Sequence, residues 1–188
     1  MAALKRTATR IFLVSVVLLV GAVVAGPRML SAGYHLIYGN VFSTTDLHAP
    51  VPPAFYVSKP RDRQGHLIMT FLSSSIGLPF RPRPSATISF HELPQGRIFD
   101  SERDTKLIDA TIAMAAEEGY ELGAISQPTI ASRSGYCLHF ASAKQSEVLR
   151  RCFIEGSQIS IYFRGDRKYL SDFEYVMRGM VIEASADK

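Results

Sequence analysis

The sequence predicts an α+β fold: an antiparallel β-sheet with two amphipathic helices packed on it, preceded by an N-terminal membrane helix. Three observations carry this prediction: an apolar run near the N-terminus, several short β-branched and aromatic segments in succession, and two separated segments with helical periodicity. Strands that follow one another without strict strand–helix alternation are typical of antiparallel sheets. The 188 residues leave room for one ordinary domain beside a targeting segment and a linker.

The apolar run covers residues 11–26, which contain no charged residue. Lys5, Arg6 and Arg10 precede it, and Pro27 ends it. As an α-helix the run would be about 24 Å long, somewhat short of the roughly 30 Å of a hydrocarbon core. Basic residues before an apolar segment stay on the cytoplasmic side, so the C-terminal bulk of the chain is expected on the far side of the membrane.

Residues 1–28 are therefore expected to be a signal-anchor that crosses the inner membrane once, through residues 9–28, with the C-terminal domain outside the cytoplasm. The run equals or exceeds the usual length of the apolar part of a signal peptide, which favours retention. The alternative is a signal peptide cleaved near Ala25, which would release a secreted or periplasmic protein.

Residues 29–65 are expected to form a semi-extended, proline-rich tether. Pro50, Pro52, Pro53 and Pro60 lie among polar residues without helical or strand periodicity. Fixed φ angles keep such a segment extended, so it would hold the domain away from the membrane surface.

The α+β domain is expected at residues 66–188. β-Branched and aromatic residues predict strands at residues 66–72, 86–90, 120–125, 135–141, 148–154 and 158–163. One helix is expected to begin at Ser101, with Asp104 completing a capping box, and to end at Gly119. A second is expected to begin at Ser171, with Glu174 three residues later.

This order of elements, with the last three strands leading into a C-terminal amphipathic helix, resembles the Mog1/PsbP-like α/β sandwich over residues 66–183. Members of that fold group are mostly binding, assembly or accessory modules. The resemblance therefore implies a non-enzymatic role, and it transfers no site residue.

The two cysteines are expected to form a disulfide across a hairpin. Cys137 and Cys152 are symmetric about the boundary between residues 144 and 145, so a turn at residues 143–146 places them opposite each other. The same register pairs Phe140 with Leu149. Outside the cytoplasm a pair of cysteines is normally oxidised. The alternative is two buried, reduced cysteines.

A second turn at Gly156 and Ser157 would place Cys152 opposite Ile161. Both faces of the resulting sheet are then partly apolar. The sequence leaves open which face the helices cover.

Composition excludes several functions. Without the three basic residues at the N-terminus, 18 basic residues face 17 acidic ones, which is too little positive charge for nucleic-acid binding. The chain has no nucleophile elbow, no phosphate-binding loop, no dinucleotide fingerprint and no His-Glu-x-x-His motif. Its five histidines are scattered, and two cysteines do not complete a zinc site. No catalytic residue, cofactor or metal is expected.

One loop is a candidate recognition site. Phe80, Arg81 and Arg83 lie in a proline-stiffened segment and would present guanidinium groups to an acidic partner or a lipid headgroup. The function expected overall is a membrane-tethered, extracytoplasmic, non-enzymatic binding or assembly module with a protein partner in the cell envelope. The alternatives are a small-molecule or lipid-binding domain and an unrecognised hydrolase, which would need a nucleophile and a base within hydrogen-bond reach in a polar cleft.

Overall fold

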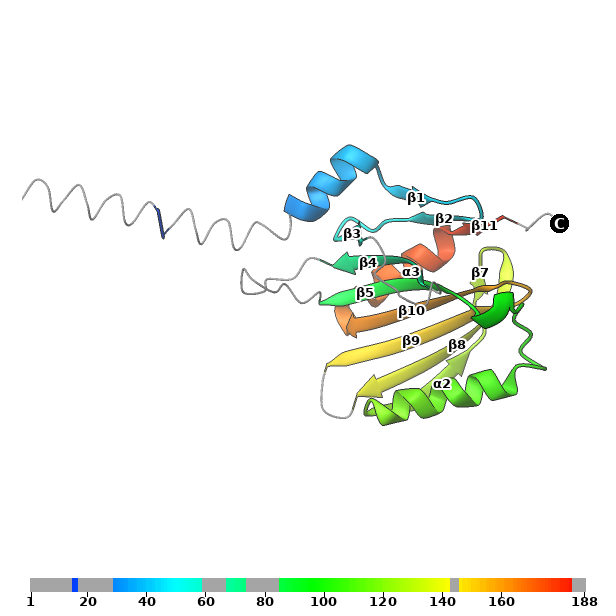
Figure 1. The fold of residues 1–188 in the computed structure, drawn as a ribbon. Helices are drawn as coiled ribbons and strands as arrows, with labels where there is room; N and C mark the ends of the chain where they lie inside the picture. The colour runs from blue at the N-terminus through cyan, green and yellow to red at the C-terminus, as the bar shows by residue number, and fades with distance from the viewer. Residues whose placement is uncertain (1–14, 17–28, 59–66, 74–84, 143–145, 184–188) are drawn as a thin grey trace, which may run out of the picture.

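The structure is a computed structural model, and it describes residues 15–16, 29–58, 67–73, 85–142 and 146–183. Figure 1 shows the arrangement of these elements. The strands are β1 (Val41–Ser43), β2 (Leu47–Pro50), β3 (Phe55–Ser58), β4 (Leu67–Ser73), β5 (Ala86–Glu92), β6 (Tyr120–Ser126), β7 (Thr129–Ile130), β8 (Arg133–Ser142), β9 (Glu147–Ile154), β10 (Ile159–Asp166) and β11 (Val181–Ile182). The helices are α2 (Thr105–Glu117) and α3 (Leu170–Gly179), with short 3-10 turns at Pro94–Gly96 and Arg167–Tyr169. Residues 29–38 form a further helical segment.

The main sheet has eight strands, in the order β3-β4-β5-β10-β9-β8-β6 with β7 beside β8. All of its strand pairings are antiparallel in the part of the chain that the structure describes. The α+β class and the antiparallel sheet are therefore confirmed. All six predicted strands of the domain are present, each within a few residues of its expected ends.

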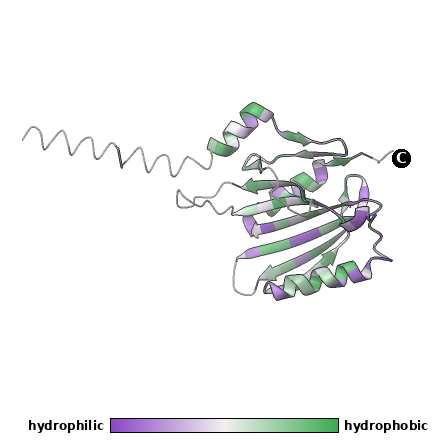
Figure 2. Cartoon of the chain, viewed as in Figure 1, coloured by the Kyte–Doolittle hydropathy of each residue, from purple (hydrophilic) through white to green (hydrophobic). Residues whose placement is uncertain are grey.

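Both faces of the main sheet are covered, each by a different helix. Leu138, Phe140 and Phe153 pack with α2 in one apolar cluster. Cys137 and Cys152, whose side chains alternate with these, belong to a larger cluster that contains α3. Figure 1 shows α2 on one side of the sheet and α3 with a small second sheet on the other. Figure 2 shows hydrophilic and hydrophobic residues alternating along the central strands.

The small sheet has the order β1-β2-β11. Two of its strands lie in the segment that was expected to be a tether, residues 29–65. Within residues 29–58, Leu47, Ala49, Val51 and Phe55 are at most 1% exposed and lie in the core beside α3. Strand β3 also pairs with β4 at the edge of the main sheet. The expectation of a tether is wrong for this segment because its apolar residues alternate along short strands between the prolines. The folded domain therefore includes residues before position 66.

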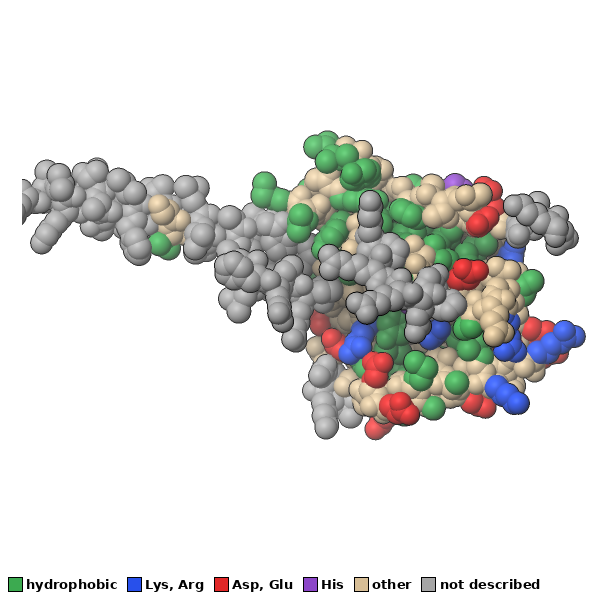
Figure 3. All heavy atoms as spheres, viewed as in Figure 1, with side chains coloured by type: hydrophobic (Ala, Val, Ile, Leu, Met, Phe, Trp, Pro, Cys, Tyr) green, Lys and Arg blue, Asp and Glu red, His purple; other side chains and the backbone are tan. Residues whose placement is uncertain are grey.

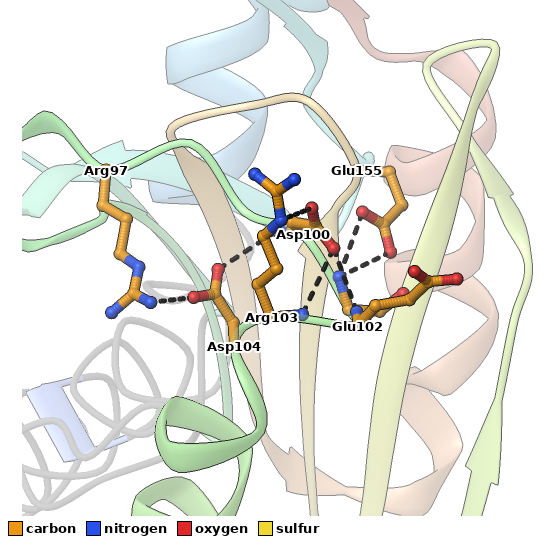
Figure 4. A network of polar contacts seen from close by, with 7 residues as sticks. Arg97, Asp100, Glu102, Arg103, Asp104 and Glu155 are labelled. Atoms are coloured by element: carbon orange, nitrogen blue, oxygen red, sulfur yellow. Dashed lines mark hydrogen bonds and ion pairs between the residues drawn. The ribbon is translucent and has the colours of Figure 1, made fainter.

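Helix α2 begins later than predicted. The carboxylate of Asp100 accepts hydrogen bonds from the backbone N–H of Glu102 at 3.0 Å and of Arg103 at 3.3 Å, so Asp100 caps the turn in which Ser101 was expected to be the cap. The buried carboxylate of Asp104 forms an ion pair with Arg97 and accepts the N–H of Asp100 at 3.0 Å. Figure 4 shows this network next to the N-terminal end of α2. The helix starts at Thr105, directly after the turn that these contacts stabilise.

No helix within the described residues is both long and apolar enough to cross a membrane. The predicted membrane segment, residues 9–28, lies outside the described residues except for Ser15 and Val16, which are helical.

Candidate functional site

The β8–β9 hairpin has the predicted register. Cys137 lies opposite Cys152, and Phe140 lies opposite Leu149. The two cysteines form a disulfide that closes a separation of 15 residues, and both are almost fully buried on the α3 face. The turn falls between the end of β8 at Ser142 and the start of β9 at Glu147, and most of it lies outside the described residues.

A cavity of about 330 Å³ lies beside the disulfide, between strands β8 and β9 and helix α3. Its lining mixes polar, charged and apolar side chains: Ser126, Pro128, Thr129, Cys137, His139, Arg150, Cys152, Glu174, Met177 and Arg178. These residues come from four strands, β6, β7, β8 and β9, from the β6–β7 connection and from α3. The name "disulfide pocket" is used below for this cavity.

A serine and a histidine are in contact in the disulfide pocket. Ser126 Oγ lies 2.6 Å from His139 Nε2. The pairing of β6 with β8 shifts by one residue between Leu122 and Ala124, which places Ser126 opposite Cys137. Without this bulge Ser126 would lie opposite Tyr136 and face α2, because a one-residue shift moves side chains to the other face. The bulge therefore brings the hydroxyl to the histidine.

The surroundings of His139 favour the neutral form of its imidazole. Burial lowers the pKa of His139, and the neighbouring Arg150 guanidinium lowers it further, while Glu174 acts in the opposite direction. Arg150 is the direct cross-strand neighbour of His139. A neutral imidazole whose Nε2 accepts the hydroxyl proton of Ser126 fits this environment.

An ion pair joins the strands to the helix across the pocket. Arg150 Nη1 lies 3.2 Å from Glu174 Oε1, with the arginine side chain 19% exposed and the glutamate 49%. One turn further along α3, Arg178 Nε donates to the backbone carbonyl of Glu174 at 3.3 Å. The lining thus contains two guanidinium groups and one carboxylate, so with His139 neutral it carries a net positive charge.

Sulfur-containing side chains line the inner part of the pocket. Cys152 Sγ lies 3.7 Å from Met177 Sδ, and both side chains are buried. Met177 belongs to α3, so the thioether closes the space between the disulfide and the helix. The pocket therefore has a polar outer part and an apolar inner part. Among the described residues, no group of three or more histidine, cysteine or acidic side chains is arranged to hold a metal ion.

The opposite face of the hairpin holds a partly buried arginine, Arg151. The Arg151 guanidinium lies over the ring of Phe153 at 5.3 Å, and burial lowers the pKa of Arg151. Its Nε has no hydrogen-bond partner within the described chain. On the neighbouring strand, Tyr162 lies directly opposite Arg151. This arrangement belongs to the packed interior beneath α2.

The predicted recognition residues Phe80, Arg81 and Arg83 lie outside the described residues. The disulfide of Cys137 and Cys152 is present. The sequence did not single out the residues around it, although the register that pairs the cysteines also pairs His139 with Arg150. Ser126 could not be found in this way because its position depends on the bulge in β6.

No family model matches the chain, and no curated protein matches it. Among solved structures, the chain is similar to LpqN of Mycobacterium tuberculosis, which is described as involved in cell envelope biogenesis. The identity is 11%, the match covers 76% of this chain and 87% of LpqN, and the TM-score is 0.47. The resemblance to the Mog1/PsbP-like sandwich stays a prediction.

Proposed function

We propose that the chain is a membrane-anchored binding module of the cell envelope, whose domain lies outside the cytoplasm and takes an acidic segment of a protein partner into the disulfide pocket. The observation that carries this proposal is the pocket itself. It brings two guanidinium groups, a hydroxyl and an imidazole from strands and helix to one cavity of about 330 Å³.

Two features support the location. Disulfides persist in oxidising compartments, and the bridge between Cys137 and Cys152 is buried in the core. Three basic residues precede the apolar run at residues 11–26, which is the arrangement of a segment that leaves its N-terminus in the cytoplasm.

The charge of the pocket supports an acidic partner. Arg150 already has Glu174 as its ion-pair partner, whereas within the described chain Arg178 donates to a backbone carbonyl and forms no ion pair. Arg178 is exposed at the rim, where a partner carboxylate can form a bidentate pair with it. Ser126 is less exposed than Arg178, and its hydroxyl oxygen can accept a hydrogen bond from a backbone N–H of the same partner.

A photocrosslinking experiment tests the proposal. Thr129, an exposed residue of the pocket lining, is replaced by p-benzoylphenylalanine in the full chain, and Met114 on α2 carries the same probe in a control chain. Irradiation of intact envelopes is expected to give a defined adduct from position 129 and none from position 114.

Charge reversal then examines the role of the arginine. Arg178→Glu is expected to remove the adduct from position 129, because the partner carboxylate would be repelled. Lys106→Glu on α2 makes the same change of charge and should leave the adduct intact. Equal adducts from both probe positions, or an adduct that survives Arg178→Glu, would rule out acidic recognition in the pocket.

The contact between Ser126 and His139 favours hydrolysis as a second candidate function. A hydroxyl at 2.6 Å from a neutral imidazole is the arrangement of a nucleophile and its general base. The charge around the imidazole favours binding instead. A general base becomes positively charged during the reaction, and Arg150 opposes that charge on His139. Covalent labelling of Ser126 by a fluorophosphonate probe would favour hydrolysis over binding.

A further inference from the structure

The helical segment 29–38 is fixed to the domain by one of its sides. Ser31 is 3% exposed, and its hydroxyl donates to the backbone carbonyls of Pro53 and Phe55, the latter at 3.1 Å. One turn later, Tyr34 packs against the core cluster that contains α3, and His35 Nε2 lies 3.1 Å from the carbonyl of Pro52. The segment is therefore a docked part of the domain with a defined inner side.

The outer side of the same segment is apolar. Met29 is 68% exposed, Leu30 57%, Leu36 88% and Ile37 72%. Positions separated by seven residues lie near the same side of a helix, so the pair 29 and 30 and the pair 36 and 37 form one row, called the apolar stripe below. Figure 3 shows hydrophobic side chains gathered on this segment. The pattern is the reverse of a surface helix, because polar Ser31 and His35 face the domain.

The apolar stripe begins close to the apolar run of the sequence. Three residue steps separate Gly26, the last residue of the run, from Met29, so their Cα atoms lie at most about 11 Å apart. Ser31, already bonded to the domain, lies at most about 18 Å from Gly26 by the same measure. A run that spans a bilayer would thus leave no length of chain to hold the domain away from the surface.

We propose that the apolar stripe lies in the interfacial layer of the lipid bilayer and seats the domain directly on the membrane. This inference rests on the proposed membrane anchoring by residues 9–28. The partner of the stripe is lipid, because the stripe begins only a few residues after an apolar run that is proposed to cross the membrane. Apolar helix faces of this kind enter the boundary between headgroups and acyl chains. Exposed Tyr38 lies beside Ile37 at the end of the segment, and tyrosine is enriched at such interfaces.

The composition of the chain provides a probe, since it contains no tryptophan. Ile37→Trp in the full chain places one fluorophore on the stripe, and Met114→Trp places one on α2, where Met114 is 58% exposed. Figure 1 shows α2 on the far side of the molecule from the helical segment. Both chains are reconstituted in phosphatidylcholine vesicles whose acyl chains are brominated near the headgroup. The Ile37→Trp chain is expected to lose most of its emission and to show a blue shift, whereas the Met114→Trp chain keeps an emission typical of water.

Two measurements separate this inference from the proposed anchoring. Alkaline extraction of the unsubstituted chain from its membranes reports the anchor, and bromine quenching reports the stripe. Retention at alkaline pH together with an unquenched, red-shifted Ile37→Trp chain would overturn the stripe and leave the anchor standing. A blue shift that depends on protein density and not on bromine would mean that a second copy covers the stripe, and would overturn lipid as its occupant. Thermal unfolding of both tryptophan chains verifies that each is folded.

Discussion

The two faces of the main sheet are covered in different ways, although β8 and β9 contribute alternate residues to both. On the α2 face, Leu138, Phe140, Leu149 and Phe153 fill the space, and Phe153 stacks on Phe99 with ring centroids 4.8 Å apart. On the α3 face, the corner next to the sheet edge carries polar groups, and a cavity remains. The same hairpin thus makes a closed interior on one side and an open pocket on the other.

This difference indicates which face of the sheet is the better candidate for a functional site. His139 and Arg150 occupy inward positions on the α3 face that apolar residues could fill, and they are partly exposed at the pocket. Polar residues at such positions reduce burial of apolar surface, which is the main source of stability. Because the polar residues of the pocket reduce stability, the pocket is a better candidate for a functional site than the packed face.

The largest effect is expected from opening the packed face. Phe153→Ala should reduce the free energy of unfolding by about 3–5 kcal/mol, because it leaves a closed cavity beside Phe99. Met177→Ala should cost only about 2 kcal/mol, the lower end for such changes, because the freed space joins the existing pocket. Denaturant unfolding of the full chain in detergent gives both values. Equal losses would show that the two faces are packed alike.

Removing the bridge on the pocket face is expected to have the next effect. The Cys137→Ala and Cys152→Ala double variant should lose about 3 kcal/mol, since the disulfide closes a loop of 15 residues in the unfolded chain. Reductant should weaken the unsubstituted chain by a similar amount and leave the double variant unchanged. An unsubstituted chain that reductant does not affect would mean that the bridge does not constrain the unfolded state.

A smaller effect is expected from pH. Because the folded state lowers the pKa of His139 below its ordinary 6.5, the unfolded state binds more protons when the pH falls below that value. The contribution of His139 is therefore present above about pH 6.5 and is lost as the pH falls through its folded pKa. Unfolding free energies at pH 7.5 and pH 5.5 should differ less in His139→Gln than in the unsubstituted chain. An identical pH dependence of the two chains would contradict burial of the neutral imidazole.

Much of the fold follows from local sequence patterns. The register of the β8–β9 hairpin could be derived because two cysteines mark one cross-strand pair, and every other pair follows from it. The next strand also has its predicted register, with Ile161 opposite Cys152. The question of which face the helices cover has a simple physical answer: both faces of the strands are apolar because both are covered.

The rest depends on long-range contacts that no local pattern reports. Residues 41–50 resemble a linker because their strands are only three or four residues long and the second ends at a proline. Their burial depends on α3, which is more than a hundred residues away in the chain. Ser126 of the pocket likewise depends on a bulge at Gly123, where a glycine in a strand is a weak indication of an irregularity. Such features are determined by packing and not by periodicity.

The pairing of β2 with β11 determines when the domain can be completed during synthesis. Leu47 pairs with Ile182 and His48 with Val181, so β2 can pair with β11 only after residues more than a hundred positions later in the chain have been made. Gly179 at the end of α3 meets the ring of Pro50, where any added Cβ would collide with Cγ. A growing chain can form the β8–β9 hairpin early, because its contacts are local, whereas the small sheet closes only after residue 182 has been added. The small sheet is therefore expected to become rigid later than the hairpin, and the face of the domain that it forms is completed only when β11 is available.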